Sequence, residues 1–274
     1  MAGVAELRSR RPSCAAMISL QRVSKSFDDG RTYAIRDVSL TIAARSFVAV
    51  IGDSGSGKTT LLKTINRLIE TDSGEITIAG DSAKTQPPYD LRRRIGYVFQ
   101  GVGLFPHLTV GENIGITPGL LGWPREAIDK RVAELIDLVA LPREFLTRMP
   151  SELSGGQQQR VGVARSLAAR PPILLMDEPF GALDPVTRDA LGTEVRNLHG
   201  SLGLTTVMVT HDVMEAVLLA DRIIVVRQGA IAADGAPHEL LTGSQDDGVR
   251  AMMDMPRRHA ERVSALLRDR IQRG

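Results

Sequence analysis

The feature that most constrains the fold of this chain is a glycine-rich stretch between a predicted strand and a predicted helix. Residues 52–60 of this stretch read Gly-Asp-Ser-Gly-Ser-Gly-Lys-Thr-Thr. The apolar residues 47–51 precede it and are typical of a buried strand, while residues 61–68 are typical of a helix. Strand, glycine-rich turn and helix is the context that the phosphate-binding P-loop, Gly-x-x-x-x-Gly-Lys-Ser/Thr, requires. The alternative is a surface loop that carries a lysine by chance.

Two kinds of group in this stretch suit a polyphosphate. Glycine lets the backbone bend so that several N–H groups point at one spot, and these groups and the helix N-terminus both favour negative charge. Lys58 is expected to reach the outer phosphates, and Thr59 to place its hydroxyl on Mg²⁺. The predicted phosphate-binding residues are Gly52, Ser54, Gly55, Ser56, Gly57, Lys58, Thr59 and Thr60.

A second stretch supplies the acids that such a site needs. Residues 173–176 are a continuous apolar run, and Asp177 and Glu178 follow it directly. A buried strand with an acid at its C-terminal end is how P-loop enzymes hold Mg²⁺. Asp177 is expected to bind the metal ion, and Glu178 to orient and deprotonate an attacking water. An ordinary strand that ends in solvated acids is the alternative.

A third stretch forms another phosphate-binding helix end. Leu153 precedes Ser154, Gly155, Gly156 and Gln157, which stand just before a predicted helix at residues 157–169. Serine is a good helix N-cap, and the glycines allow close approach of a ligand to exposed N–H groups. The two phosphate-binding ends lie far apart in sequence, so a second copy of the protein is expected to complete each site. Ser-Gly-Gly taken alone is usually a turn.

Alternating strands and helices predict an α/β fold, a P-loop NTPase core with a mainly parallel sheet. Paired strands at residues 18–27 and 38–42 indicate an N-terminal antiparallel β subdomain. Between residues 101 and 150 the one strong pattern is helical, which indicates an inserted α-helical subdomain at about residues 101–165. Further elements are expected at residues 75–79, 91–94, 95–99, 127–139, 185–198, 205–210, 213–220 and 223–226.

The two ends of the chain are predicted to lie outside the nucleotide-binding domain, which is expected to span residues 18–243. Residues 1–17 lack an apolar segment behind their arginines, so they are expected to be a disordered tail rather than a signal peptide; Met17 is a second candidate for the start. Residues 244–274 are expected to form a short helical extension that packs on the domain or a partner, with anionic lipid as the alternative. Its apolar stripe is Val263, Leu266, Leu267 and Ile271.

Composition argues against several other classes of protein. Lysine and arginine number 34 against 32 acidic residues, which is too even for a nucleic-acid-binding domain, and only 4% of residues are aromatic. Cys14 is the one cysteine among the 274 residues, so no intrachain disulfide forms. No apolar run approaches the roughly 18 residues of a membrane span. The protein is therefore expected in the cytosol unless another chain holds it at a membrane.

With these motifs in this order, residues 18–241 resemble the ATP-binding subunits of ABC transporters. The P-loop is residues 52–59 and the family signature is residues 153–157. The strand that ends in the metal-binding acid is residues 173–178. The lid glutamine of the family matches Gln100, its dimer-contact loop matches residues 181–184, and its switch histidine matches His211.

The resemblance implies a head-to-tail dimer that sandwiches two ATP, each with Mg²⁺, between the P-loop of one chain and the signature of the other. Phe27 resembles the aromatic residue that stacks on adenine, with Tyr33 as the second candidate and a core aromatic as the alternative for both. His211 would contact the γ-phosphate, and Gln100 would contact the metal ion and assist hydrolysis. Asp184, at the composite site, would mainly tie the two chains together.

Within importers, residues 92–100 and 103–110 resemble the subunits that drive uptake of quaternary-amine osmoprotectants such as glycine betaine, choline and carnitine. This implies transmembrane permease subunits, an extracytoplasmic solute-binding protein and a peripheral place on the cytoplasmic face of the inner or plasma membrane. The second ATPase subunit would be another copy or a paralogue. Phe105, Pro106 and His107 would lie where a membrane partner docks, or pack internally. Gly101 stands where the family has a second glutamine, and the tail is too short for the regulatory domain of many relatives.

Other functions remain open. One is an importer of amino acids, sulfate or similar solutes. Another is a non-transport ABC ATPase acting in DNA repair or on ribosomes, although the coiled-coil insertions and zinc cysteines common in such proteins are missing from the sequence. A third is a nucleotide-binding scaffold without hydrolysis, against which Glu178 and His211 argue.

Overall fold

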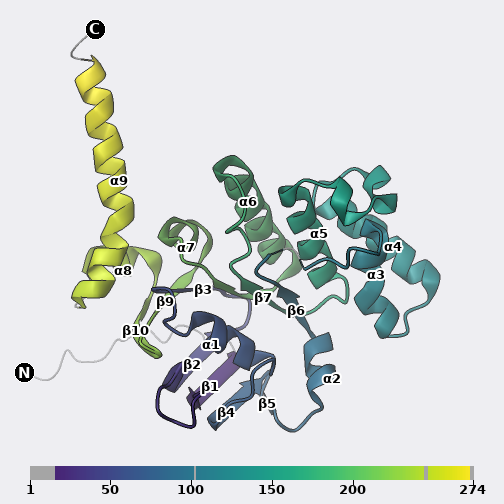
Figure 1. Ribbon diagram of the computed structural model, residues 1–274, viewed down its shortest axis with the longest axis horizontal. Helices are drawn as coiled ribbons and strands as arrows, with labels where there is room; N and C mark the ends of the chain where they lie inside the picture. The colour runs from purple at the N-terminus through teal and green to yellow at the C-terminus, as the bar shows by residue number, and fades with distance from the viewer. Residues whose placement is uncertain (1–15, 102, 244–245, 272–274) are drawn as a thin grey trace, which may run out of the picture.

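A computed structural model describes residues 16–101, 103–243 and 246–271 of the chain, and the side chains of residues 256, 259–260 and 263–271 lie outside the description. The predicted tail, apart from its last two residues, and the predicted apolar stripe of Val263, Leu266, Leu267 and Ile271 therefore fall outside the described residues and side chains. Figure 1 shows sheets at the centre, helices above and to the right, and the last helix at the left edge.

The core of the molecule is a six-stranded sheet with the strand order β10-β9-β3-β8-β7-β6. The five strands from β9 to β6 run parallel, and β10 pairs with β9 in the antiparallel sense. Every residue of β3, β7 and β8 is buried, as expected of a parallel sheet covered on both faces. The strands are β3 (Phe47–Ile51), β6 (Ile95–Val98), β7 (Ile173–Asp177), β8 (Thr205–Val209), β9 (Arg222–Arg227) and β10 (Ala230–Gly235).

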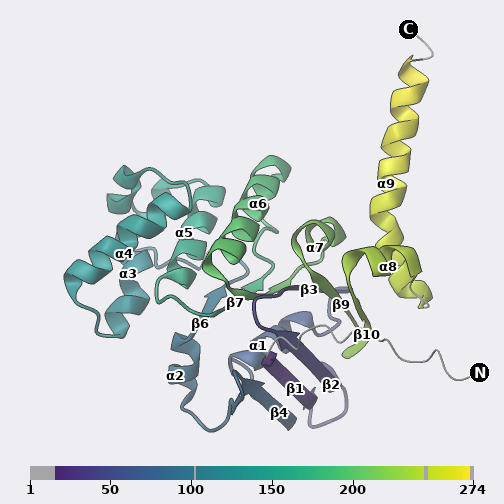
Figure 2. The same cartoon turned by 180° about the vertical axis from the view of Figure 1, so that it is seen from behind.

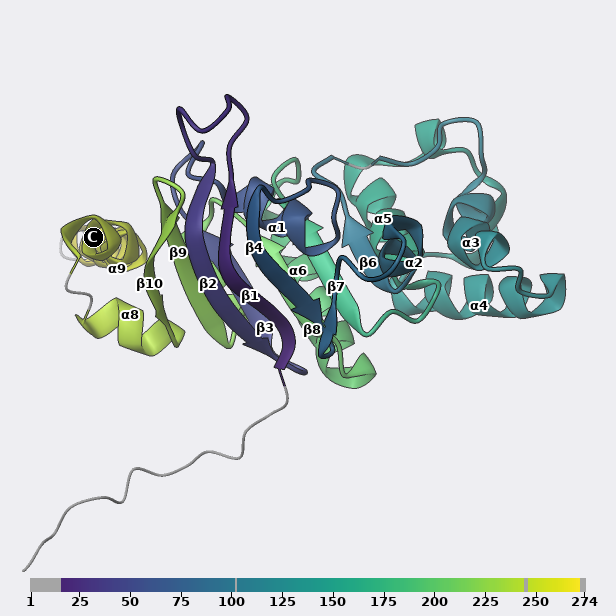
Figure 3. The same ribbon diagram turned by 90° about the horizontal axis from the view of Figure 1, so that it is seen from below.

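One face of this sheet is covered by a second, antiparallel sheet with the order β2-β1-β4-β5. Helix α1 (Lys58–Ile65) shares a hydrophobic cluster with both sheets, which includes Val48, Leu62 and Leu20. Seen from below, β1, β2 and β4 lie across the near side of the molecule (Figure 3). The strands are β1 (Ala16–Lys25), β2 (Ile35–Ala43), β4 (Ser73–Ile78) and β5 (Asp81–Ser82).

The helical part lies at one end of the molecule, beyond the edge strand β6 (Figures 1 and 2). Its interior continues the cluster on the other face of the parallel sheet, since Ile114, Leu135 and Val161 pack with residues such as Met176. The helices are α3 (Val110–Leu120), α4 (Arg125–Leu138) and α5 (Gly155–Leu167), with 3₁₀ segments at Arg143–Thr147 and Pro150–Glu152. Helix α2 (Pro88–Arg93) lies apart from them, below β6 in Figure 1, and its Leu91 packs in the cluster shared by α1 and both sheets.

The remaining helices cover the face of the parallel sheet opposite α1 and the end of the sheet at β10. They are α6 (Pro185–Leu202), α7 (Val213–Leu219), α8 (Pro237–Gly243) and α9 (Asp247–Ile271). Val249 and Met253 anchor the first turns of α9 in the core, and the rest of the helix extends away from the body (Figure 1). Among the described residues, no helix is both long enough and apolar enough to span a membrane.

The predicted fold class is confirmed, because the mainly parallel sheet, the antiparallel sheet and the helical insertion are all present. Several element boundaries differ. The first helix ends at Ile65 and not at residue 68, since Asn66 terminates it and Arg67 has a left-handed φ of 55°. Helix α3, helix α8 and strand β10 had no prediction, because glycine, proline and alanine weaken their periodic patterns. The domain boundaries given above remain predictions.

Candidate nucleotide-binding site

The P-loop connects β3 to α1 through a backbone that requires glycine at two positions. Gly57, at the N-cap of α1, has φ of 104°, and a Cβ there would lie 2.1 Å from the carbonyl oxygen of Ala34. A Cβ on Gly52 would lie 2.1 Å from the carbonyl oxygen of Val226. The loop is therefore packed tightly between β9 and the segment that leads into β2, so only glycine fits at these turns.

The neighbouring Ser56 has a structural role in this loop. Its N–H donates to the carbonyl oxygen of Asp53 at 3.2 Å, and its own carbonyl oxygen accepts from the N–H of Gly229 at 3.0 Å. The side chain is buried, and its Oγ has no hydrogen-bond partner among the described residues. Ser56 and Gly52 thus shape the loop from behind, while the other predicted P-loop residues line a cavity.

That cavity has a volume of about 460 Å³ and opens at the carboxyl ends of the parallel strands. The P-loop forms one side of it, and three residues that follow β6, β7 and β8 form the other. Polar groups from four separate segments therefore converge on one space. The lining residues are Ala34, Ser54, Gly55, Gly57, Lys58, Thr59, Thr60, Gln100, Glu178 and His211.

Lys58 is buried at the floor of this cavity. Its Nζ donates to the carbonyl oxygens of Gly52 at 2.8 Å and Asp53 at 2.7 Å. Burial lowers the pKa of the ammonium group, while the carboxylates of Glu178, Asp53 and Asp177 oppose this effect. A phosphate group in the cavity would give this cation a partner of opposite charge.

Asp177, at the end of β7, is also buried, and its two carboxylate oxygens have different partners. Oδ1 accepts a hydrogen bond from the Thr59 hydroxyl at 2.9 Å. Oδ2 accepts one from the Tyr97 hydroxyl at 3.2 Å and lies 3.5 Å from Nζ of Lys63. Burial and the Asp177 carboxylate raise the pKa of Tyr97, so its hydroxyl remains a donor. Thr59 and Asp177 offer neighbouring hard oxygen atoms, which fit Mg²⁺.

Glu178 contacts two other predicted residues that line the cavity, Gln100 and His211. Its Oε2 accepts a hydrogen bond from Nε2 of Gln100 at 3.0 Å and lies 3.4 Å from Nδ1 of His211. The Glu178 backbone has φ of 46°, and its N–H donates to the carbonyl oxygen of Val209 at 2.9 Å. This turn separates the carboxylate of Glu178, which lines the cavity, from that of Asp177, which is bonded to the Thr59 hydroxyl.

The signature residues lie outside the lining of this cavity. Ser154 caps α5, its Oγ accepting from the N–H of Gln157 at 3.3 Å, while Oε1 of Gln157 accepts from the N–H of Ser154 at 3.0 Å. This reciprocal capping box fixes the helix start, where Ser154 and Gly155 are exposed. Gly156 packs against α6, since a Cβ there would lie 2.6 Å from Cγ2 of Thr187. The structure therefore shows two separate glycine-rich helix N-termini, those of α1 and α5, in one chain.

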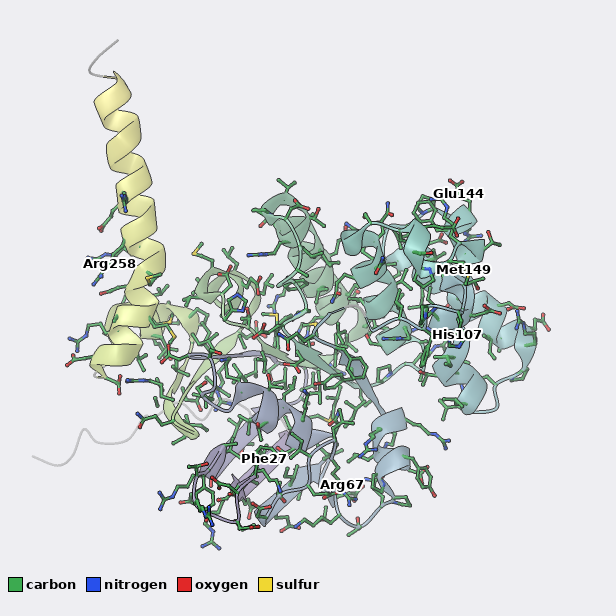
Figure 4. The ribbon with its side chains drawn as sticks, in the orientation of Figure 1. Phe27, Arg67, His107, Glu144, Met149 and Arg258 are labelled. Atoms are coloured by element: carbon green, nitrogen blue, oxygen red, sulfur yellow. The ribbon has the colours of Figure 1, made fainter. Side chains whose placement is uncertain are left out.

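Three other predicted residues also lie apart from the cavity lining. Asp184 caps α6, because its Oδ1 accepts from the N–H groups of Val186 and Thr187 at 3.1 Å each, and its hydrogen bonds with Thr187 lower its pKa. Phe27 is 67% exposed between β1 and β2, with Nζ of Lys25 over its ring at 5.5 Å (Figure 4). Tyr33, the second candidate for stacking on adenine, is 41% exposed.

Three residues at the site had no predicted role: Ala34, Lys63 and Tyr97. Ala34 lines the cavity with a featureless side chain, so nothing in the sequence marks it. Lys63 stands four residues after Thr59, which places both on one face of α1 and could have suggested a shared partner. Tyr97 is two residues before the end of its predicted strand, and its partner Asp177 lies on the adjacent strand β7.

This fold and this cavity define a P-loop nucleotide-binding domain. The family model described as "ABC transporter" matches residues 35–181, more than half of the chain. The chain belongs to the ABC transporter family.

Similar proteins from other organisms support the same family. The chain is 50% identical over 241 residues to the glycine betaine/carnitine/choline transport ATP-binding protein OpuCA of Bacillus subtilis, covering 88% of this chain and 63% of that protein. It is 51% identical over 234 residues to the glycine betaine uptake system ATP-binding protein YehX of Escherichia coli, covering 85% of this chain and 75% of YehX. The chain thus spans less than two thirds of the length of OpuCA.

Solved structures show the same fold. A dimeric, post-hydrolysis structure of the ATP-binding cassette MJ0796 bound to ADP and Pi matches with a TM-score of 0.72 and 36% identity, covering 80% of this chain and 98% of that one. The structure of cbiO1 from Clostridium perfringens, part of an ABC transporter complex, matches with a TM-score of 0.77 and 25% identity, covering 89% and 97%.

Proposed function

We propose that this chain is the ATP-hydrolysing subunit of a solute importer. The observation that carries the proposal is the convergence of Gln100 and His211 on Oε2 of Glu178, at the wall of a cavity whose floor is the P-loop. A binding module would need the P-loop alone, whereas an acid held between an amide and an imidazole is suited to act on water.

The reaction is phosphoryl transfer from ATP to water, which gives ADP and phosphate. The P-loop N–H groups and Lys58 would hold the phosphates, and Thr59, Asp177 and Gln100 would hold Mg²⁺. The metal ion supplies charge neutralisation when it is bound. Glu178 orients the attacking water and takes its proton, and His211 contacts the γ-phosphate. Phe27 is the residue proposed to stack on adenine.

A second chain completes each site in this proposal. Ser154, Gly155, Gly156 and Gln157 present a helix end that lies outside the P-loop cavity of their own chain, and a phosphate there needs a P-loop from elsewhere. Two solved structures of the relative MJ0796 are of dimers of that cassette. We therefore propose a head-to-tail dimer with a second copy or a paralogous subunit, in which Asp184 lies near the contact.

The groove between β6 and the helical part is the proposed docking place of a transmembrane permease. Its volume is about 390 Å³, and its lining includes Phe99, Phe105 and Leu120, which are 44%, 41% and 66% exposed. His107 lies beside it, its ring 6.1 Å from that of Phe105 (Figure 4). Docking here would make the chain a peripheral subunit at the cytoplasmic face of the membrane, served indirectly by an extracytoplasmic solute-binding protein.

A quaternary-amine osmoprotectant is the proposed solute. Several relatives at about half identity are named for glycine betaine, choline or carnitine transport. The alternative is sulfate, since a sulfate/thiosulfate import ATP-binding protein of Agrobacterium fabrum is 46% identical over 225 residues. The lower identity of this relative favours the osmoprotectant.

The experiment that tests this function begins with capture of the tagged full chain from gently solubilised native membranes. Recovery of an integral membrane subunit is expected, and the complex is then placed in proteoliposomes with ATP. Uptake of labelled glycine betaine, choline or carnitine supports the proposal, and uptake of sulfate alone supports the alternative. Recovery only of ribosomal or DNA-bound partners would exclude an importer.

A further inference from the structure

The side chain of Tyr97 connects two regions that the proposed function treats separately. Its hydroxyl donates a hydrogen bond to Oδ2 of Asp177 at 3.2 Å. Tyr97 also lines the groove between β6 and the helical part, together with Phe99 and Phe105. One residue of β6 therefore both bonds to the buried carboxylate of Asp177 and lines the groove.

The two oxygens of the Asp177 carboxylate face different neighbours. Oδ1 is bonded to the hydroxyl of Thr59, which lines the cavity. Oδ2 is bonded to Tyr97 and lies 3.5 Å from Nζ of Lys63, behind the cavity lining. Asp177 is 2% exposed, so water has little access to it. Anchoring one oxygen of a buried carboxylate fixes the direction in which the other points.

We propose that Tyr97 is a positioning residue for the metal ion of the nucleotide site. Its hydroxyl holds Oδ2 of Asp177 so that Oδ1 faces Thr59 and the metal ion they share. Tyr97 itself does not touch the metal ion or the nucleotide. The inference rests on the proposed function, in which Thr59 and Asp177 hold Mg²⁺.

The ring of Tyr97 is itself held in place. It lies against Phe99, with ring centroids 4.7 Å apart and planes tilted by 59°. Phe99 lines the groove, so a partner seated there would contact the ring pair whose hydroxyl holds Asp177. Tyr97 is thereby fixed at two points, which is what a positioning residue requires.

The test separates the metal ion from the nucleotide. The dissociation constant of the full chain for a fluorescent ATP analogue is measured in excess Mg²⁺ and again in EDTA. The constant in EDTA divided by the constant in Mg²⁺ gives the contribution of the metal ion to binding. Tyr97→Phe keeps the ring and removes only the hydroxyl. We expect unchanged affinity in EDTA and a roughly tenfold smaller ratio. Loss of a hydrogen-bond partner of a metal ligand typically weakens metal binding by about 10–100-fold, and tenfold is the lower end of that range.

Tyr89→Phe is the matched control, because Tyr89 lies on α2 with its ring over Arg93 and is 58% exposed. Its ratio should equal that of the wild type. In an Asp177→Asn background, Tyr97→Phe should have no further effect on the ratio, since the carboxylate that it positions is gone.

Two results would overturn the inference. One is an unchanged ratio in Tyr97→Phe, and the other is an equal loss of affinity with and without Mg²⁺, which would mean that the hydroxyl supports the loop and not the metal ion. A wild-type chain that binds no nucleotide would instead overturn the proposed function, and this inference with it.

Discussion

Glu178 adopts a backbone conformation that residues other than glycine seldom take, with φ of 46°. Such conformations cost on the order of 1–3 kcal/mol and persist only where the surroundings fix them. Here the N–H is bonded to Val209, and the carboxylate to Gln100. The presence of an acid after a buried strand was predictable from sequence, whereas this turn was not, because no residue preference marks it.

Replacing Glu178 by glutamine tests its role as the base. The amide keeps the shape of the side chain but cannot take a proton, so the rate of ATP hydrolysis is expected to fall by roughly 10²–10⁴-fold. Nucleotide affinity should change little. Steady-state phosphate release and binding of an ATP analogue measure the two quantities.

The control for this change is Glu144→Gln in the helical part, where the side chain is 74% exposed (Figure 4). It should leave hydrolysis at the wild-type rate. A Glu178→Gln chain that hydrolyses ATP at a near wild-type rate would show that another group is the base.

Lys58→Ala is expected to act on binding. The variant loses a buried cation next to the phosphates, and hydrogen bonds to charged groups contribute about 1.5–3 kcal/mol, so nucleotide affinity should fall by roughly 10–100-fold. Titration with a fluorescent ATP analogue measures this. The exposed Lys84 provides the control variant Lys84→Ala, and equal affinity of the two variants would contradict the assignment of Lys58.

At the scale of elements, the P-loop shows why its glycine spacing is so informative. The sequence predicted the strand, turn and helix in the right order, since the pattern itself encodes the backbone. The neighbours against which Gly57 packs could not be predicted, because Ala34 belongs to the segment that leads into a different sheet.

Gly57→Ala measures the tightness of this packing. A Cβ 2.1 Å from a backbone oxygen forces the loop to move, so the free energy of unfolding should fall by about 3 kcal/mol, and nucleotide binding should be lost. Denaturant unfolding and analogue titration measure the two effects.

Gly122→Ala is the comparison for this variant. Gly122 also has a left-handed φ, 73°, but a Cβ there would meet no atom within 4 Å. Alanine at this position is disfavoured only by the left-handed φ, so the free energy of unfolding should fall by about 1–2 kcal/mol. Similar destabilisation by the two variants would show that the P-loop yields more easily than its contacts indicate.

Helix ends differ in how well the sequence reports them. Ser154 was predicted as an N-cap, and the structure shows the capping box that it forms with Gln157. The same box at Thr109 and Glu112 starts α3 and was overlooked, because the three glycines and the proline within that helix obscure its periodicity. A cap is thus a better guide than periodicity where a helix carries many glycines.

At the scale of the whole molecule, the chain holds two half-sites that it does not join. In a head-to-tail dimer with twofold symmetry, each nucleotide would contact Lys58 of one chain and Ser154 of the other. A chain with Lys58→Ala and a chain with Ser154→Arg should each be inactive alone. Mixed, they should regain up to about a quarter of the wild-type hydrolysis, because half of random dimers contain one intact site.

The contradicting result is a mixture that stays inactive although both variants still form dimers, as measured by analytical ultracentrifugation. Mixing Lys58→Ala with Gly57→Ala is the control, since both changes damage the P-loop and no combination restores an intact site.

The strand order of the central sheet could not be predicted from the sequence. Apolar runs marked β3 and β7 as buried strands, and further strands were expected at the positions of β8 and β9, but which of them are neighbours depends on packing between distant segments. β10 also escaped prediction, because its alternation of alanine with isoleucine and aspartate is too weak to indicate a strand. The motifs therefore predicted the residues of the candidate site better than the arrangement that brings them together.

The turn between β9 and β10 holds the P-loop from behind. The N–H of Gly229 bonds to the carbonyl oxygen of Ser56, and the carbonyl oxygen of Gly229 accepts from the N–H of Arg36. This turn thus joins the phosphate-binding loop to the first residues of β2, although it lies far along the chain from both. The length of this turn is therefore constrained, unlike that of most surface turns. Inserting or deleting a residue beside Gly229 would displace the P-loop, although nothing in the sequence links the turn to that loop.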